Sequence, residues 1–483
     1  MSTINKSNRR TKIVATLGPA TDSPEMMRKI ISAGVNVVRL NFSHGSHEEH
    51  GKRIALVRAA AKDLKMVVGI LADLQGPKIR VANFIDGKIT LAEGDKFILD
   101  AELDRNVGDQ QQVGIDYKDL PKDVVKGDTL LLDDGRMVFT VDSVVDSKIH
   151  CIVKVGGVLS NHKGINRKGG GLTAKALTDK DKDDLSFALK NKVDFIAISF
   201  PRNADDINEA RALIEQQKGE AAIIAKIERA EAVDEIDAII EASDGVMVAR
   251  GDLAVEIGDA EVPAVQKRII QRARILDKPI ITATQMMESM ISSSVPTRAE
   301  VSDVANAVLD YTDAVMLSAE SAVGVNPVIV IETMSRICEA AEQSPESQQS
   351  RHRVECFFER VDEAIAMATM YTANHLDIKA VVSLTESGMT TLWMSRIRTC
   401  IPIYGLSRFK KALGRMSLYR GVYPVYFDAT HCSRDSVNRD AVSVLVSQDI
   451  VQQDDLVILT KGDHMGEGGG TNAMKILSVG SII

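Results

Sequence analysis

Short apolar runs alternate with helical patterns along much of this chain. Eight runs rich in Val, Ile, Leu and Ala predict buried strands: KIVATLG, VNVVRLNFSHG, MVVGILADLQG, VDFIAISFPR, AAIIAKIER, DGVMVARGD, PIITATQMMES and DAVMLSAES. The alternation predicts right-handed βαβ units and a parallel sheet. Eight units predict an α/β fold built on a closed (β/α)8 TIM barrel. An open, doubly wound sheet is the alternative, but no GxGxxG motif follows the first run.

Polar side chains stand at the end of most of these runs. They are Arg39, Asn41, Ser43, Asp73, Ser199, Lys226, Glu228, Asp252, Thr284, Ser318 and Glu320. The C-terminal ends of parallel strands meet at one rim of a barrel, where its chemistry takes place. Two carboxylates and an ammonium group at that rim suit a hard divalent cation that holds an anionic substrate. Taken singly, each of these residues could equally be a solvated loop charge, a rim salt bridge or a helix cap.

The spacing of the polar ends predicts an inserted domain. Most neighbouring ends are roughly 24 to 34 residues apart, whereas Asp73 and Ser199 are separated by 126. A loop of that length is improbable inside a compact domain, so we expect an insertion of roughly a hundred residues. The segments GDKFILD, DTLLLDDG, RMVFTVDSVV and KIHCIVKVGG alternate apolar and polar positions. They predict a small antiparallel β-domain.

The barrel pattern resumes after the insertion and ends before a further domain. Thr178 is a predicted helix N-cap, and Thr297 with Glu300 forms a predicted capping box. A polar stretch, Glu342–Arg353, precedes runs such as KAVVSL, IPIYGL, YPVYF and LVILT, which predict another α/β domain. The predicted divisions are the barrel at 1–76 and 176–346, the inserted β-domain at 77–175 and the C-terminal α/β domain at 347–483.

The amino-acid composition limits the kinds of binding partner and the cellular compartment that we expect. One Trp, 4% aromatic residues and a net charge of −8 argue against nucleic acid as the main partner. The five cysteines are odd in number and contain no CxxC pair, which predicts free thiols in a reducing compartment. The N-terminus is polar and no apolar run is long enough to span a bilayer. We therefore expect a cytoplasmic protein that does not bind membranes.

Several long motifs resemble one enzyme family. RLNFSHG, DLQGPKIR, AKIER, ARGDLAVEI, ATQMMESM with PTRAE, and DAVMLSAES are similar to the motifs of pyruvate kinases, in particular of a bacterial, potassium-independent branch. The resemblance extends from Arg10 to the C-terminus. It implies phosphoryl transfer from phosphoenolpyruvate to ADP, which gives pyruvate and ATP in the last step of glycolysis. It also implies that the inserted β-domain is a lid, that the C-terminal domain binds an effector, and that the protein is a homotetramer.

The resemblance assigns roles to the residues at the rim. Glu228 and Asp252 would hold Mg2+ or Mn2+, and the backbone N–H groups of Gly251 and Asp252 would receive the substrate carboxylate together with Thr284. Most members have Gly where this chain has Ala254. One methyl group there should not abolish the chemistry.

Phosphoryl transfer and enolate protonation involve further rim residues. Arg39 and Lys226 would flank the transferring phosphoryl group, so the predicted catalytic residues are Lys226, Arg39 and Thr284. The proton donor to the enolate stays open between Thr284 through a water chain, Lys226, Ser318 and Glu320. By the same resemblance, the nucleotide-binding residues are Asn41, His44, Arg80 and Lys163.

A monovalent-cation site is implied at Asn41, Ser43, Asp73 and the carbonyl of Leu74. Many members have Glu where this chain has Lys78, and members with the combination of Leu74, Gln75 and Lys78 are generally potassium-independent. We therefore expect Lys78 to substitute for the ion.

A candidate effector loop lies in the C-terminal domain. Its predicted ligands are Thr385, Glu386, Ser387, Gly388 and Thr390, and a second loop, Glu467–Asn472, is a candidate wall or a plain hairpin. Members activated by fructose-1,6-bisphosphate often carry Lys where this chain has Glu386. A carboxylate there repels a second phosphate, so we expect a sugar or nucleotide monophosphate.

Two other functions remain as alternatives. A barrel aldolase or lyase acting on pyruvate would use Lys226 as a Schiff-base nucleophile, although the carboxylates of Glu228 and Asp252 argue for a metal site instead. A metabolite sensor without catalysis would bind sugar phosphates through the C-terminal domain. The complete set of Lys226, Glu228, Asp252 and Thr284 argues against an inactive site.

Overall fold

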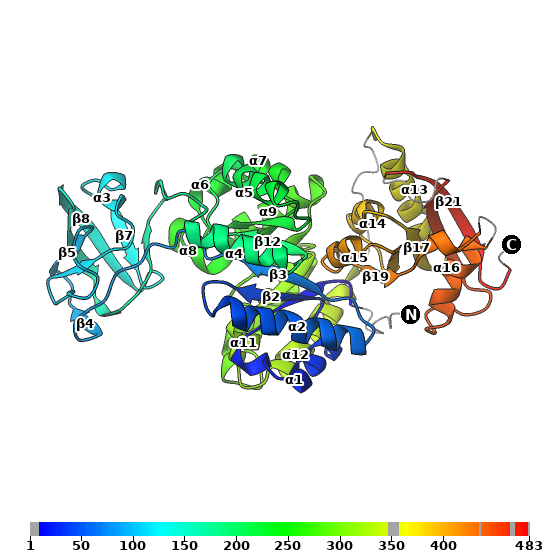
Figure 1. Ribbon diagram of the computed structural model, residues 1–483, viewed down its shortest axis with the longest axis horizontal. Coiled ribbons are helices and arrows are strands. Elements are labelled where there is room, and N and C mark those ends of the chain that lie inside the picture. Colours follow the sequence, from blue (N-terminus) through cyan, green and yellow to red (C-terminus); the bar gives the residue numbers. More distant parts are fainter. Residues whose placement is uncertain (1–8, 346–356, 434–435, 464–468, 482–483) are drawn as a thin grey trace.

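The computed structural model describes residues 9–345, 357–433, 436–463 and 469–481. Three regions follow one another along its longest axis: a small β-domain, a barrel and a C-terminal α/β domain (Figure 1). The predicted divisions at 76/77 and 175/176 lie in loops between these regions, whereas the one at 346/347 lies outside the described residues. The order of the regions agrees with the predicted fold class.

Within residues 9–345, eight parallel strands close into a barrel in the order β1-β16-β15-β14-β13-β12-β3-β2. They are β1 (Lys12–Thr16), β2 (Val37–Asn41), β3 (Gly69–Asp73), β12 (Phe195–Ile198), β13 (Ala222–Ile227), β14 (Gly245–Ala249), β15 (Ile280–Ala283) and β16 (Ala314–Leu317). Each corresponds to one of the eight predicted runs, so the closed barrel is confirmed and the open sheet is wrong. Closure comes from β1, which pairs with both β2 and β16.

Helices surround the barrel (Figure 1). They are α1 (Pro24–Ser32), α2 (His47–Asp63), α4 (Asp179–Lys190), α5 (Ala204–Gln216), α6 (Ala230–Asp234), α7 (Ile236–Ala242), α8 (Arg250–Ile257), α9 (Val262–Ile275), α10 (Arg298–Leu309), α11 (Ala319–Ala322) and α12 (Pro327–Glu342). The predicted caps are confirmed, since Thr178 caps α4 and Thr297 with Glu300 forms a capping box at α10.

The inserted domain has its own apolar core and lies between β3 and α4. Its elements are β4 (Lys88–Leu91), β5 (Lys96–Asp100), β6 (Gln112–Gly114), α3 (Leu120–Asp123), β7 (Thr129–Leu132), β8 (Met137–Val145), β9 (Lys148–Val155), β10 (Gly157–Ser160) and β11 (Ile165–Arg167). Between residues 88 and 167, all of them described, six strands form one sheet and two form another. The pairs are antiparallel as predicted, except that β6 pairs parallel with β5.

The C-terminal domain is a mixed sheet with helices. Its elements are α13 (Val361–His375), β17 (Ile378–Leu384), α14 (Met389–Ser395), β18 (Ile403–Ser407), α15 (Lys410–Met416), β19 (Val422–Tyr426), α16 (Val437–Val446), β20 (Leu456–Gly462) and β21 (Thr471–Ser478). In the described parts of this domain, five strands are ordered β19-β18-β17-β20-β21, and β21 is antiparallel to its neighbour.

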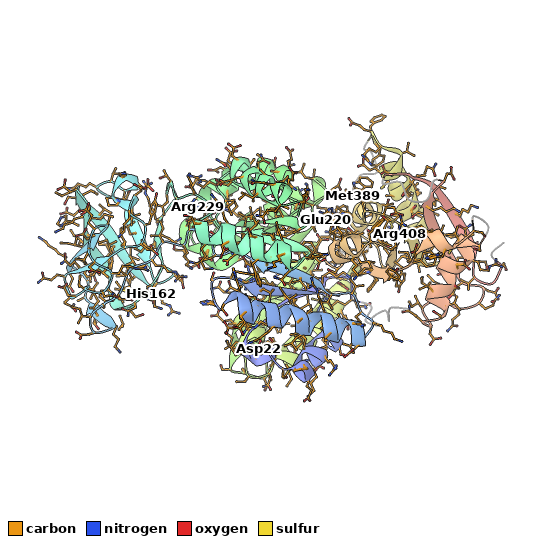
Figure 2. The ribbon with its side chains drawn as sticks, viewed as in Figure 1. Asp22, His162, Glu220, Arg229, Met389 and Arg408 are labelled. Atoms are coloured by element: carbon orange, nitrogen blue, oxygen red, sulfur yellow. The ribbon has the colours of Figure 1, made fainter. Side chains whose placement is uncertain are left out.

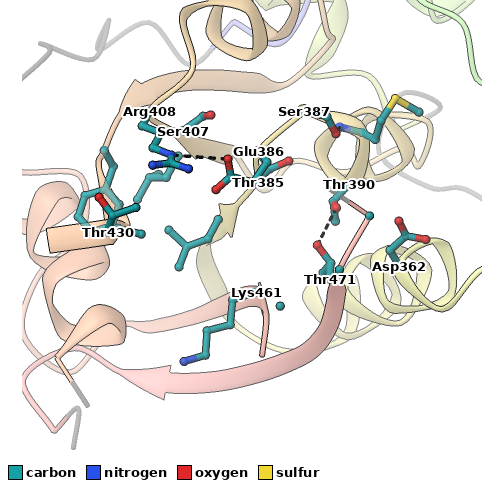
Figure 3. Close-up of a pocket in the computed structure, with 18 residues that line it drawn as sticks. Asp362, Thr385, Glu386, Ser387, Thr390, Ser407, Arg408, Thr430, Lys461 and Thr471 are labelled. Carbon is teal, nitrogen blue, oxygen red and sulfur yellow. Dashed lines mark hydrogen bonds and ion pairs between the residues drawn. The ribbon is translucent and has the colours of Figure 1, made fainter. Parts of the chain in front are cut away.

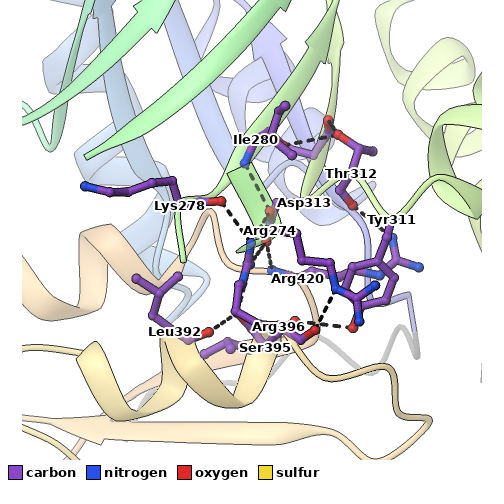
Figure 4. Close-up of polar contacts among 12 residues, drawn as sticks. Arg274, Lys278, Ile280, Tyr311, Thr312, Asp313, Leu392, Ser395, Arg396 and Arg420 are labelled. Carbon is purple, nitrogen blue, oxygen red and sulfur yellow. Dashed lines mark hydrogen bonds and ion pairs between the residues drawn. The ribbon is translucent and has the colours of Figure 1, made fainter. Parts of the chain in front are cut away.

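The barrel interior and the C-terminal domain share one apolar cluster. Val14 and Leu71 belong to the same cluster as Trp393 and Met416. Beside it, a polar network joins Arg396, at the end of α14, to the buried carboxylate of Asp313 just before β16 (Figure 4). Asp313 also accepts hydrogen bonds from backbone N–H groups of Ile280 and Arg420. This contact involves the N-terminal ends of the strands and leaves the C-terminal rim available for a site.

Among the described residues, Cys151, Cys338, Cys400 and Cys432 are free thiols, as predicted, and Cys356 lies outside them. No helix in the described part of the chain has the length and apolar character needed to cross a membrane.

Candidate active site

The end of β2 and the end of β3 bring Arg39 and Asp73 into contact. Arg39 Nε lies 2.6 Å from Asp73 Oδ2, and Arg39 Nη1 donates to Thr16 Oγ1 at 3.0 Å. Register pairing also sets Asn41 opposite Asp73 across these two strands. Burial raises the pKa of the Asp73 carboxyl, but the charges of Lys226 and Arg39 outweigh burial and lower it. Asp73 is therefore a buried anion held between two cations.

Lys226 stands at the centre of the rim. Its Nζ lies 2.7 Å from Ser199 Oγ, 2.9 Å from Glu228 Oε1 and 3.2 Å from Asp73 Oδ1. Burial alone would lower the pKa of this ammonium group, but the carboxylates of Asp73 and Glu228 raise it above its ordinary value. A lysine that stays protonated is a poor imine-forming nucleophile. The geometry therefore disfavours the Schiff-base alternative.

Glu228 is buried and makes two contacts. Its Oε1 faces Lys226, and its Oε2 accepts a hydrogen bond from the N–H of Phe200 at 2.8 Å. Burial raises the pKa of this carboxyl to about 7, a net value that includes the lowering effect of Lys226 and the raising effect of Asp252. Positive charge added here would favour the ionised carboxylate.

Asp252, in the first turn of α8, pairs with Lys78 at 2.9 Å. Lys78 stands just after β3 and also lies 3.6 Å from Asp134 of the inserted domain. Burial lowers the pKa of the Lys78 ammonium, but Asp252 and Asp134 outweigh burial and raise it. The ammonium group of Lys78 thus neutralises Asp252, while the cations beside Asp73 are Arg39 and Lys226.

These two carboxylates fit a divalent cation. Glu228 and Asp252 each pair with the ammonium group of a lysine. A bound metal ion would replace or supplement this positive charge at the two carboxylates. The described residues contain no group of three or more His, Cys, Asp or Glu side chains that could hold a metal ion. Substrate oxygens and water would therefore have to complete the coordination shell, as is common for Mg2+.

Thr284 and Gly251 meet across the ends of β14 and β15. The Gly251 N–H donates to Thr284 Oγ1 at 2.9 Å, and that hydroxyl donates to the Ala283 carbonyl at 2.7 Å. Thr284 has a φ of +66°, which is uncommon for a β-branched residue and is often found at functional sites. The N–H that was predicted to receive a carboxylate thus has a hydroxyl partner that a ligand could replace.

Arg250 was missed by sequence reasoning although it precedes Gly251 in the ARGD motif. Its guanidinium donates to the carbonyl of Thr284 at 2.6 Å and pairs with Asp303 of α10. It therefore holds the strained backbone of Thr284 in place. The adjacent Met286 and Met287 are buried, in agreement with a packing role.

The predicted cation ligands already have protein partners. Leu74 O accepts from Ser199 Oγ at 2.7 Å, and Asn41 Oδ1 accepts from the Ser43 N–H at 3.1 Å. Asn41 and Asp73 are the last residues of β2 and β3, and Ser43 and Leu74 follow them on the loops. Ser199 was predicted only as a polar strand end, and it proves to connect Leu74 with Lys226.

Arg80 and Lys163 lie together on the inserted domain. Arg80 and Gly164 form a β-bridge, and Arg80 Nη1 donates to the carbonyl of His162 at 2.8 Å. Lys163 Nζ lies 2.6 Å from Asp133 Oδ1. Figure 2 shows His162 on this domain and Arg229 at the neighbouring side of the barrel. Two of the four predicted nucleotide residues, Arg80 and Lys163, are thus carried by the inserted domain rather than by the barrel.

Ser318 and Glu320, two candidate proton donors, belong to a backbone-binding turn. Glu320 accepts from the N–H groups of Ser318 at 2.6 Å and Met287 at 3.3 Å. Burial raises the pKa of its carboxyl. These contacts are typical of a structural role.

A second pocket lies in the C-terminal domain (Figure 3). Four of the predicted effector residues line it, namely Thr385, Glu386, Ser387 and Thr390, while the Gly388 N–H donates to Thr385 Oγ1 at 2.9 Å. The second predicted loop contributes Gly469, Gly470 and Thr471, but Glu467 and Gly468 lie outside the described residues. Two cationic residues that were not predicted, Arg408 and Lys461, also line the pocket. Arg408 pairs with Glu386 at 3.7 Å.

The fold and the rim define a (β/α)8-barrel enzyme that binds an anionic substrate among buried cations and carboxylates. The family described as "Pyruvate kinase, barrel domain" matches residues 8–331, and the one described as "Pyruvate kinase, alpha/beta domain" matches residues 363–477. The chain belongs to the pyruvate kinase family and is a phosphotransferase.

Related proteins match along nearly the whole chain. It is 54% identical to the pyruvate kinase II of Salmonella typhimurium, covering 98% of this chain and 99% of the relative. It is 52% identical to the pyruvate kinase of Haemophilus influenzae, with the same coverage. The family uses phosphoenolpyruvate and ADP, gives pyruvate and ATP, and generally requires Mg2+.

Proposed function

We propose that this chain is a Mg2+-dependent, potassium-independent pyruvate kinase that a phosphate monoester activates through the C-terminal pocket. The observation that carries the proposal is the ammonium group of Lys226, held between Asp73 and Glu228 at the rim. Asp252 and Thr284 stand after the next two strands of the same rim. We further propose a cytoplasmic homotetramer.

Arg39 and Lys226 bind the phosphoryl group in this proposal. Both pair with buried carboxylates, so both are oriented before the substrate arrives. As negative charge spreads over the transferring oxygens, these two cations stabilise it without reorganisation. Mg2+ or Mn2+ on Glu228 and Asp252 would supply additional positive charge next to the substrate oxygens.

The carboxylate end of the substrate binds at the start of α8. The N–H groups of Gly251 and Asp252 point out of the first turn of a helix, where anions are favoured. Thr284 Oγ1, which now accepts from Gly251, would turn to the substrate. Thr284 is also the favoured proton donor to the enolate, relayed by water, because the Glu320 carboxylate is occupied by the backbone N–H groups of Ser318 and Met287.

The nucleotide binds on the lid side of the rim in this proposal. Asn41, at the end of β2, and His44, just after it, contact the nucleotide from the barrel, and Arg80 with Lys163 contact it from the lid once the lid closes. The positive charge of Lys78 replaces that of a monovalent cation. Its ion-pair partners are Asp252 and Asp134 rather than the predicted cation ligands Asn41, Ser43, Asp73 and Leu74.

Effector binding is proposed at the C-terminal pocket. Arg408 and Lys461 supply positive charge for one phosphate, and hydroxyls of Thr385, Ser387 and Thr390 supply donors. Glu386 lines the same pocket and repels a second phosphate. A sugar or nucleotide monophosphate therefore suits the pocket better than a bisphosphate.

A coupled assay tests the central proposal. The purified chain should convert phosphoenolpyruvate and ADP to pyruvate, measured through lactate dehydrogenase, and chelation of Mg2+ should abolish the reaction. A protein that binds these ligands without turnover would instead support the sensor alternative. Borohydride trapping with pyruvate should leave Lys226 unmodified, and covalent trapping there would favour the lyase alternative.

A further inference from the structure

The loop between β2 and α2, residues 42–46, carries Ser43 and His44. Backbone hydrogen bonds tie its beginning to the barrel, since the Phe42 N–H donates to the Asp73 carbonyl at 2.9 Å and the His44 N–H donates to the Asn41 carbonyl at 3.2 Å. Its remaining shape depends on side chains from α2 and α4. These side chains lie outside the catalytic set described above.

Asp184 of α4 is a buried carboxylate that joins two supports of this loop. Its Oδ1 lies 2.7 Å from His47 Nε2, at the start of α2, and its Oδ2 lies 2.6 Å from Lys180 Nζ. Lys180 in turn donates to the Phe42 carbonyl at 2.7 Å. Only 3% of Asp184 is exposed, so these interactions compete little with water.

Two stacked ring pairs support the same loop. The rings of Phe42 and His50 stack with their centroids 4.3 Å apart, and the rings of His47 and Phe187 stack at the same separation. His50 Nε2 donates to the His44 carbonyl at 2.9 Å. Burial lowers the pKa of His50, which keeps the ring neutral with its proton available for that carbonyl. The loop is thus supported by α2 and α4 together.

The first turn of α4 also holds the point where the chain leaves the barrel for the lid. Asp181 Oδ1, fully buried, accepts a hydrogen bond from the Gly76 N–H at 3.0 Å. Asp181 and Asp184 are one turn apart on the helix. One short stretch of α4 therefore fixes both the loop after β2 and the base of the lid.

We propose that Asp184 is a positioning residue for the nucleotide substrate. Through His47 and Lys180 it fixes the backbone of residues 42–46, and it thereby sets the place of His44 without touching the substrate itself. The inference rests on the proposed function, in which His44 faces the nucleotide. The substrate that gives up its phosphoryl group binds at Arg39, Lys226 and Thr284, which this loop does not hold.

Steady-state kinetics of full-length Asp184→Asn test the proposal. This substitution keeps the size of the side chain but removes the charge that His47 and Lys180 share. We expect the KM for ADP to rise about fivefold to tenfold, while kcat and the KM for phosphoenolpyruvate change by less than about twofold. Asp183→Asn is the matched control, because Asp183 is exposed on the same helix, and its kinetics should equal those of the wild type. An equal rise in both KM values, or an unchanged KM for ADP in a folded variant, overturns the proposal.

A double-mutant cycle with His44→Ala separates this inference from the proposed function. If Asp184 acts through the loop, His44→Ala raises the KM for ADP and the double variant adds little to it. Fully additive effects overturn the positioning role while leaving His44 at the nucleotide. An unchanged KM for ADP in His44→Ala overturns the nucleotide placement and the inference with it. Should Asp184→Asn fail to fold, His47→Ala replaces it in the same cycle with the same expected result.

Discussion

Lys226 sets the charge balance at the barrel rim. Its single ammonium group contacts the carboxylates of both Asp73 and Glu228, while Arg39 takes the other oxygen of Asp73 and Lys78 takes Asp252. Anions and cations thus balance before any ligand arrives. A substrate with both a phosphate and a carboxylate brings extra negative charge, which explains why a divalent cation is needed as well.

Removing either proposed metal ligand should remove catalysis. We expect Glu228→Gln and Asp252→Asn to lose at least about a hundredfold in kcat while remaining folded by circular dichroism, as electrostatic groups at a transition state do. Glu215→Gln, at an exposed position of α5, is the control for loss of one carboxylate. Near-normal activity of either rim variant at saturating Mg2+ would contradict the assignment.

Potassium dependence tests the role of Lys78. Because Lys78 brings a tethered ammonium group, wild-type activity should be substantial in buffer without sodium or potassium, and potassium chloride should change it little. Lys78→Glu should make activity depend on potassium or abolish it, since it removes the ammonium group and adds a carboxylate near Asp252. Assays at constant ionic strength measure this, and a tenfold rise of wild-type activity on adding potassium would refute the substitution.

At the scale of elements, the hydrophobic periodicity and capping residues of the sequence predicted the strands and helix caps, whereas contacts between distant residues were missed. All eight barrel strands and the two helix caps followed from local pattern, because apolar runs and capping residues act within a few positions of the chain. The parallel pairing of β6 with β5 depends on a long connection, which no local pattern specifies. Arg250 and Arg408 were missed for the same reason, since their partners Asp303 and Glu386 are distant in sequence.

The pocket beside α14 should respond to phosphate monoesters. At sub-saturating phosphoenolpyruvate, a sugar or nucleotide monophosphate should activate several-fold and fructose-1,6-bisphosphate should have little effect, because Glu386 lines the pocket. Arg408→Ala should remove the activation, whereas Lys410→Ala, at an exposed position nearby, should retain it. Strong activation of the wild type by the bisphosphate would be inconsistent with the pocket's charge.

At the scale of the whole molecule, the barrel and the C-terminal domain form a continuous structure. Their shared apolar cluster and the buried pair of Asp313 and Arg396 connect the N-terminal ends of the strands to α14, which follows the effector loop. Removing one member of such a buried pair is strongly destabilising. Packed side chains of the two domains therefore join the end of α14 to the base of β15 and β16.

Lys12 makes this interface sensitive to pH. It is buried, its Nζ donates to the Val422 carbonyl at 2.5 Å, and burial lowers its pKa to about 7. Between pH 7 and the ordinary lysine pKa near 10.5, Lys12 is protonated in the unfolded chain but not in the folded one. The free energy of unfolding therefore rises with pH in this window, by at most about 1.4 kcal/mol per pH unit. Relative to Lys12→Met, the Tm of the wild type should therefore increase from pH 7 to pH 9. A constant or decreasing difference would show that Lys12 stays charged in the fold.

We expect the inserted domain to close over the rim for phosphoryl transfer to the nucleotide. Arg80 and Lys163 are carried by the inserted domain, so they act on a barrel-bound substrate only if that domain moves over the rim. Both connections contain glycines in a left-handed conformation, Gly76 with a φ of +67° and Gly169, Gly170 and Gly171 with positive φ values.

Small-angle scattering and hydrogen exchange should detect that closure. With Mg2+ and ADP together, we expect a smaller radius of gyration and greater protection of residues 76–80 and 169–171, whereas Mg2+ alone should change neither. In Asp252→Asn, losing a proposed metal ligand should abolish the response to ligands while leaving these glycines intact. Since Lys78 already bridges Asp252 and Asp134, the same variant also loses a contact between barrel and lid and should show a larger ligand-free radius. Identical profiles for the wild type with and without ligands would mean that the lid does not move and that Arg80 and Lys163 do not reach the nucleotide.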